Sequence, residues 1–205
     1  MRDAAFIDVV LTNPINHAIL QRLPQLGLRD AWLVSGSLFQ TVWNAITGRP
    51  PTYGIRDYDV FYFDGLDLSW QAEDRAIHAA AEIFADLDAE IEVRNQARVH
   101  LWYPRKFGVA YPPLTGSTDA IDRFLATACM VGVTVNPSGG VDVYAPFGLT
   151  DLERMIVRPN VTPNFKAERY REKAARWRQC WPELHIIEPA PSEPSPHRNQ
   201  DTGQP

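Results

Sequence analysis

The sequence predicts an α+β domain with a mixed β-sheet and flanking helices. Strand-like and helix-like segments are interspersed along the chain, and two pairs of strand-like segments are separated by turn residues. Of the 205 residues, 45% are hydrophobic, which is enough for a core. We expect one domain over residues 1–187. Residues 188–205 are rich in proline and polar side chains, which predicts a disordered tail.

The first two predicted elements are helices. Apolar side chains recur at helical spacing over residues 5–10. Asn13 and Pro14 form an N-cap followed by a first-turn proline, which predicts a second helix to about Leu26. Gly27 is expected to end that helix.

A strand, a turn and a helix are predicted next. Residues 31–34 form a short apolar run, which indicates a buried strand that ends in a tight turn at residues 35–37. Apolar side chains from Leu38 to Ile46 then lie on one face of a helix. Gly48 is its expected C-cap.

The middle of the chain predicts three strands and one helix. Residues 57–63 are β-branched and aromatic, and residues 69–87 are amphipathic with helical spacing. Residues 91–93 and 97–103 are expected to form two further strands. Asn95-Gln96 is expected to join them in a hairpin.

The last part predicts two more strands and three helices. Helices are expected over residues 119–127, 149–155 and 164–181. Residues 131–135 and 141–144 flank a Pro-Ser-Gly-Gly segment, which is typical of a hairpin.

Charge and composition exclude several classes of protein. The formal net charge of −5 argues against a strongly basic nucleic-acid groove. Cys129 and Cys180 are too few for a disulfide scaffold or a cysteine-rich zinc site. No apolar run approaches the roughly 18 residues of a membrane span. The N-terminus lacks the apolar region of a signal peptide, so we expect a cytoplasmic protein without a membrane partner.

Asp57 and Asp59 are the first candidate site residues. Residues two apart on a strand point to the same face, so the two carboxylates are directed at one point. Like charges this close require a counterion, for which a divalent cation with oxygen ligands is suited. The alternative is a solvated edge strand whose acids cap the preceding turn.

Gly36 and Ser37 suggest a phosphate site. Glycine allows close approach of the backbone, and the following helix presents free amides to an anion. The alternative is a plain turn and N-cap. Because only a helix and a loop separate these residues from the two aspartates, the pattern suits a nucleoside triphosphate (NTP) with magnesium.

The order of strand, Gly-Ser, helix and Asp-x-Asp resembles that of the polymerase-β-type nucleotidyltransferase superfamily. With Gly48-Arg49-Pro50 it is similar in layout to the head domain of CCA-adding enzymes, but Leu38-Phe39-Gln40 replaces their Val-Arg-Asp and the loop is longer. The remaining segments resemble an uncharacterised bacterial family of nucleotidyltransferase-like proteins. The segments that carry this resemblance are residues 95–103, 145–152 and 157–160.

The resemblance implies a nucleotidyltransferase-like core and a third carboxylate on a later strand. Glu92 is the candidate, with Glu90 on the same strand face as the second choice. An ion pair between Glu92 and Arg94 is the alternative. The implied reaction is two-metal transfer of a nucleoside monophosphate from an NTP to a hydroxyl of a small molecule or protein, with release of pyrophosphate. Asp57, Asp59 and Glu92 would hold two Mg²⁺ ions, and Gly36 and Ser37 the β- and γ-phosphates.

Two other functions remain open. The chain could bind nucleotides or a partner protein without catalysis, or it could modify nucleic-acid ends. The net charge and the missing Val-Arg-Asp argue against the nucleic-acid function.

Some further residues have alternative interpretations. Asn95 and Arg98 are candidate substrate contacts, and hairpin formation explains Asn95 equally well. His100 is expected to be a hydrogen-bonded histidine in the sheet. Trp102, Trp177 and Trp181 are expected in the core. Basic residues of 166–178 predict a solvated helix face, or in part a groove for a polyphosphate.

Overall fold

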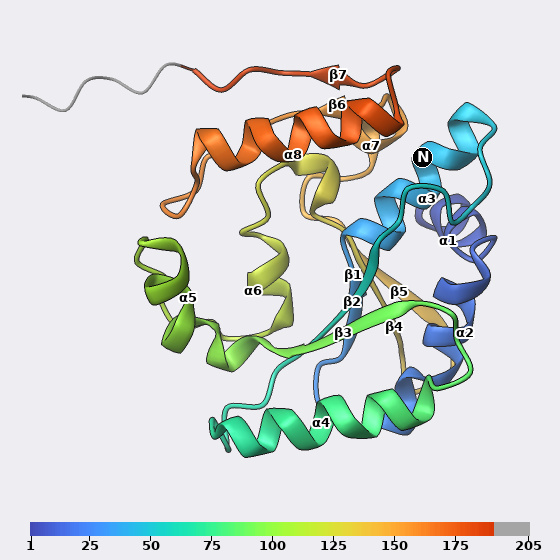
Figure 1. Cartoon of the computed structure of the whole chain (residues 1–205). Coiled ribbons are helices and arrows are strands. Elements are labelled where there is room, and N and C mark those ends of the chain that lie inside the picture. Colours follow the sequence, from blue (N-terminus) through green and yellow to red (C-terminus); the bar gives the residue numbers. More distant parts are fainter. Residues whose placement is uncertain (191–205) are drawn as a thin grey trace, which may run out of the picture.

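The computed structural model describes residues 1–190, which form a mixed five-stranded sheet, a small two-stranded sheet and surrounding helices (Figure 1). This confirms the predicted α+β class. The large sheet has the order β3-β2-β1-β4-β5 and comprises β1 (Trp32–Val34), β2 (Asp57–Tyr62), β3 (Glu90–Asn95), β4 (Gly132–Val135) and β5 (Val141–Tyr144). The small sheet comprises β6 (Ile156–Val157) and β7 (His185–Ile186). The helices are α1 (Asp3–Val10), α2 (Pro14–Arg22), α3 (Gly36–Thr47), α4 (Trp70–Ile83), α5 (Val99–Phe107), α6 (Ser117–Ile121), α7 (Thr150–Glu153) and α8 (Ala167–Cys180), with 3₁₀ turns η1 (Leu23–Leu26), η2 (Gln96–Arg98) and η3 (Thr127–Cys129).

The strand pairing makes the large sheet mixed. β2 and β3 are parallel, whereas β1 is antiparallel to both β2 and β4, and β4 is antiparallel to β5. The β4–β5 pair is the hairpin predicted around the Pro-Ser-Gly-Gly segment. A parallel pair needs a crossover connection, and α4 supplies it between β2 and β3. Ser69 is the N-cap of α4, as its hydroxyl accepts a hydrogen bond from the amide of Ala72 at 3.2 Å.

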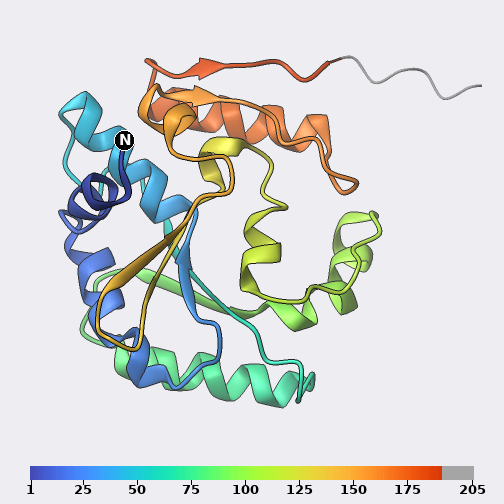
Figure 2. The ribbon, with the colours of Figure 1, turned by 180° about the vertical axis from the view of Figure 1, so that it is seen from behind.

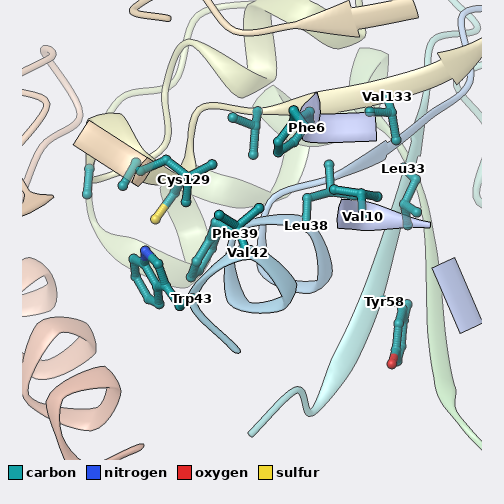
Figure 3. Packing of buried hydrophobic residues seen from close by; sticks show 14 of the residues in the cluster. Phe6, Val10, Leu33, Leu38, Phe39, Val42, Trp43, Tyr58, Cys129 and Val133 are labelled. Atoms are coloured by element: carbon teal, nitrogen blue, oxygen red, sulfur yellow. The ribbon is translucent and has the colours of Figure 1, made fainter. Parts of the chain in front are cut away.

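The two faces of the sheet have different environments. Every second residue of β2 is buried, and these residues are Tyr58, Val60 and Tyr62. They join the main core beneath α1–α4, in which Leu33 and Val133 of the sheet lie near Val10 and Phe6 of α1 (Figure 3). α5 and α6 lie on the other side of the sheet from α1 and α2 (Figure 2). The intervening residues of β2 are partly exposed on that side.

An aromatic cluster joins α3 to α8. The ring centroid of Trp43 lies 6.0 Å from that of Trp177 and 5.5 Å from that of Trp181. The Trp181 indole donates a hydrogen bond to Asn44 Oδ1 at 2.9 Å. These contacts confirm the predicted core positions of Trp177 and Trp181, which are 4% and 1% exposed. They also fix α8 across the end of the sheet where β1 ends and β2 begins (Figure 1).

The predicted strand over residues 97–103 is wrong, and with it the hairpin at Asn95-Gln96. These residues form η2 and the start of α5, and the Asn95 side chain caps η2 by accepting a hydrogen bond from the amide of Ala97 at 3.1 Å. The apolar residues Val99, Trp102 and Tyr103 have helical spacing, and they pack on one side of α5. His100 is therefore a helix residue, partly buried, and its Nδ1 has no hydrogen-bond partner among the described residues. Trp102 is only partly buried.

Other differences are changes of length. The second predicted helix ends at Arg22 and continues as η1, and the helix predicted over residues 119–127 is limited to α6. Glu188 forms an ion pair with Arg171 at 3.1 Å, whereas residues 191–205 of the predicted tail lie outside the described residues.

None of the described helices has both the length and the apolar character needed to cross a membrane.

Candidate functional site

Three carboxylates lie on two adjacent strands and on one face of the sheet. Asp57 and Asp59 are two residues apart on β2, and Asp59 is paired in register with Glu92 of β3. The same face of β2 carries the partly exposed Phe61, opposite the face that enters the main core. The parallel pairing of β2 and β3 therefore places the three acids that the sequence suggested on one face of the sheet.

The electrostatics of Asp59 reflect this crowding. Burial raises the pKa of Asp59, and the negative charges of Asp57 and Glu92 raise it further, to about 7. Lys173 and Arg94 act in the opposite direction. A carboxyl group that ionises only near neutral pH indicates a position where added positive charge would be stabilising.

Glu92 also forms an ion pair with its neighbour on the same strand face. Arg94 Nη2 donates a hydrogen bond to Glu92 Oε2 at 3.2 Å. The ion pair that the sequence offered as the alternative for Glu92 is therefore present. Glu90 pairs in register with Asp57 but is exposed and lines a separate depression with Asp88. The arrangement favours Glu92 over Glu90 as the third carboxylate.

The described residues contain no preformed metal centre. Among residues 1–190, no three His, Cys, Asp or Glu side chains are close enough together to hold a metal ion as they stand. The oxygen donors of Asp57, Asp59 and Glu92 nevertheless suit a hard divalent cation in their chemistry. Glu92, the neighbour of Asp59 in register, is paired with Arg94.

The turn between β1 and α3 adjoins Asp57. A Cβ atom placed on Gly36 would lie 3.8 Å from Asp57 Oδ1 and 3.3 Å from Gln40 Nε2, so glycine keeps this approach open. The preceding Ser35 has φ 54° and ψ −113°, which non-glycine residues rarely adopt. Sequence reasoning missed this strained residue, because the Ser-Gly-Ser run reads as an ordinary turn. Backbone strain of this kind is concentrated at functional sites.

Ser37 is placed differently from its neighbour. Its side chain is fully buried, and its Oγ has no hydrogen-bond partner among the described residues. The amides of Leu38 and Phe39 bond to the carbonyl of Ser35, so the amides of Gly36 and Ser37 are the first of α3 and have no partner within the helix. The group of Ser37 that is available to a ligand at the helix N-terminus is thus its backbone amide, not its hydroxyl.

Asn95 and Arg98 are engaged in contacts within the protein. The Asn95 side chain bonds to both the amide and the carbonyl of Asp64, at 3.1 and 2.9 Å. Arg98 forms an ion pair with Glu73, and both side chains are 11% exposed. Neither Asn95 nor Arg98 lines the cavity that adjoins Glu92.

Three basic residues of α8 face the sheet. Arg169 and Lys173 line the cavity that contains Glu92, and Arg176 lines a smaller one with Asp57 and Gln40. Their spacing of four and three residues puts them on one helix face, which was the available signal in the sequence. These three residues thus line cavities rather than a fully solvated face, and the groove for a polyphosphate stays a prediction.

Comparisons with known proteins agree with this arrangement. A family model described as nucleotidyltransferase matches residues 21–186. An NMR structure described as revealing a CCA-adding enzyme head domain is similar to the chain, with 25% sequence identity and a TM-score of 0.74. That similarity covers 92% of this chain and 97% of the other. A comparison with curated proteins finds no match.

Proposed function

The chain belongs to the nucleotidyltransferase family whose model it matches, and from this premise we propose that it transfers a nucleoside monophosphate from an NTP to a hydroxyl group. One observation carries the proposal: Asp57, Asp59 and Glu92 lie on one face of two paired strands, with Gly36 beside Asp57. Such a set can hold a triphosphate at one end and divalent cations at the other.

The carboxylates are the expected metal ligands. Asp57 and Asp59 supply oxygen donors from β2, and Glu92 supplies them from β3. Bound Mg²⁺ would neutralise the triphosphate and polarise its α-phosphorus. The raised pKa of Asp59 supports this assignment, because a cation would offset the repulsion from Asp57 and Glu92 that raises it.

The triphosphate is assigned to the start of α3. The amides of Gly36 and Ser37 would hold the β- and γ-phosphates at the positive end of the helix. Arg176 and Arg56 line the cavity that contains Asp57, and they add positive charge there. The hydroxyl of Ser37 has no part in this proposal, since it is buried.

The acceptor hydroxyl is assigned to the Glu92 side. Glu92 would take the proton of the hydroxyl, whose oxygen forms a bond to the α-phosphorus. The bond between that phosphorus and the bridging oxygen of pyrophosphate breaks, and pyrophosphate leaves with the electron pair. The proposed acceptor is a small molecule or a protein, in the cytoplasm. The net charge of −5 argues against a nucleic acid.

The ion pair between Glu92 and Arg94 favours one alternative. If this pair persists when nucleotide binds, Glu92 is unavailable, and the chain would bind nucleotides or a partner without catalysis. That alternative predicts Mg²⁺-dependent NTP binding with no transfer.

Radiolabelled NTPs test the proposal. The wild-type protein is incubated with each α-labelled NTP, Mg²⁺ and a cell extract, and the labelled product is identified. We expect label transfer that Asp57→Asn abolishes and that Asp8→Asn, at an exposed position of α1, leaves unchanged. Isothermal titration measures NTP binding in parallel. Binding without transfer would support the non-catalytic alternative, and absence of both would refute the proposal.

A further inference from the structure

A cavity of about 330 Å³ adjoins the carboxylates, and Glu92 is part of its wall. It is lined by residues of β2, β3, α5, α6 and α8 and of the loops between them. The smaller cavity that contains Asp57 shares no lining residue with it. The two cavities are therefore separate, with Glu92 in the wall of the larger one and Asp57 in the wall of the smaller one.

The order of the site residues gives each cavity a role. Asp57 is nearest Gly36 and the start of α3, where the triphosphate is assigned. Glu92 is on the neighbouring strand, beyond Asp59. A ligand in the larger cavity would thus approach the reaction centre from the Glu92 side, where the acceptor hydroxyl is assigned.

The walls of the larger cavity are rich in aromatic rings. Five aromatic side chains line it, namely Phe61, Trp102, Tyr103, Tyr111 and Phe124. The ring centroids of Tyr103 and Tyr111 are 4.4 Å apart, and those of Phe61 and Phe124 are 5.8 Å apart. Rings in such arrangements offer flat apolar surfaces, which suit a planar ring of a ligand.

The same cavity has an excess of positive charge. Five basic side chains line it together with the single carboxylate of Glu92, and they are Arg94, Lys106, Arg123, Arg169 and Lys173. Within residues 1–190, Arg94 alone of the five has a carboxylate oxygen within 4.0 Å. This excess predicts an anionic ligand.

Arg123 is the sharpest indication of that ligand. Its Nε is buried and has no hydrogen-bond partner among the described residues, although it is a strong donor. Its guanidinium lies over the Tyr111 ring, 5.2 Å from the centroid. The Arg123 side chain lines the cavity beside this aromatic wall, where an anionic group attached to a ring would contact both the guanidinium and the rings.

We propose that this cavity binds the acceptor, and that the acceptor is a small molecule with a planar aromatic ring, an anionic group and a free hydroxyl. This rests on the proposed function, because it takes the transferred group to arrive beside Glu92. The anion is a phosphate or a carboxylate, which the basic side chains would bind alike.

Isothermal titration with three related probes tests the ligand class. 1-Naphthyl phosphate has both ring and charge, 1-naphthol has the ring alone, and cyclohexyl phosphate has the charge without an aromatic ring. We expect 1-naphthyl phosphate to bind at least about tenfold more tightly than either of the others. Equal affinity for all three, or no binding of 1-naphthyl phosphate, would overturn the proposal.

Adjacent residues of α5 provide a matched control. Lys106 lines the cavity, whereas the exposed Arg105 does not. Lys106→Gln and Arg123→Gln are each expected to weaken binding of 1-naphthyl phosphate about three- to tenfold, and Arg105→Gln to leave it unchanged. Circular dichroism melting checks that each variant is folded. Equal effects of Lys106→Gln and Arg105→Gln would show that the probe binds elsewhere, against the proposal.

A last titration separates acceptor from nucleotide. It uses 1-naphthyl phosphate in the presence of Mg²⁺ and a saturating non-hydrolysable ATP analogue. Simultaneous binding supports the proposal, whereas displacement of the probe would assign the cavity to the nucleoside and overturn it. If the analogue itself does not bind but the probe does, the proposed function and the acceptor role both fail, while the ligand class of the cavity stands.

Discussion

Replacing Asp59 by Asn should stabilise the metal-free protein at high pH and much less at low pH. The pKa of Asp59 is raised from 3.8 to about 7 in the folded state, first by burial and then by Asp57 and Glu92. Between these two pH values the folded state binds more protons at Asp59 than the unfolded state does. The free energy of unfolding therefore falls as pH rises from about 4 to about 7.

The size of the effect follows from the shift. A change of about 3 pKa units corresponds to about 4 kcal/mol of lost stability above pH 7. Because Asp59 is partly exposed, water screens its interactions, and we expect about 2 kcal/mol in practice. For a protein of this length, that is a shift of about 4–8 °C in the melting temperature.

Thermal melting of wild type and Asp59→Asn at pH 4 and pH 8, without divalent cations, measures this difference. Asp8→Asn on α1 is the matched control, since it makes the same change at an exposed position. The gain of Asp59→Asn over wild type should be larger at pH 8 and should shrink when Mg²⁺ is added, because the cation would offset the charge of Asp59 in the wild type. A gain that is the same at both pH values would refute the reasoning.

Three further substitutions test the frame around the site, each by urea unfolding. Gly54→Ala should cost about 2 kcal/mol or more, because Gly54 has φ +71° and an added Cβ would lie 2.8 Å from the Trp181 ring; an unchanged midpoint would contradict that packing. Trp181→Phe should cost about 1–3 kcal/mol, since it leaves Asn44 Oδ1 without its indole donor and removes ring contacts; a neutral result would show that the bond adds nothing. Glu73→Gln should cost about 3 kcal/mol by leaving Arg98 buried without its charge partner, and an additional Arg98→Met should recover part of the loss if the pair is the cause.

The sequence was sufficient for most of the fold because its helices and strands carry local signals. The N-cap at Asn13, for example, accepts from the amides of Ile15 and Asn16, as the Asn-Pro pair predicts. The candidate carboxylates were also identifiable, since alternation along β2 puts Asp57 and Asp59 on one face. Glu92 came from the family resemblance rather than from spacing, because strand pairing is a non-local property that a single strand does not encode.

The remaining parts of the site depend on tertiary contacts that the sequence does not show. The basic residues of α8 look like an exposed face until Trp177 of α8 and the following Trp181 anchor this helix against α3. That anchoring places Lys173 near the carboxylates, where its positive charge offsets part of the rise in the pKa of Asp59. Likewise, the backbone strain at Ser35 arises where its amide bonds to the carbonyl of Val131 after β1 ends, which no local pattern predicts.

The segment that the sequence predicted wrongly has a direct bearing on function. Residues 97–103 alternate enough to resemble a strand, yet most of them form the start of helix α5, which places Trp102 and Tyr103 in the wall of the cavity beside Glu92. A strand over the same residues would have extended the sheet, with successive side chains on opposite faces. The conflict between local pattern and final structure thus occurs at the cavity we assign to the acceptor. The helix that follows β3 thus supplies part of the proposed acceptor site within the fold that carries the carboxylates.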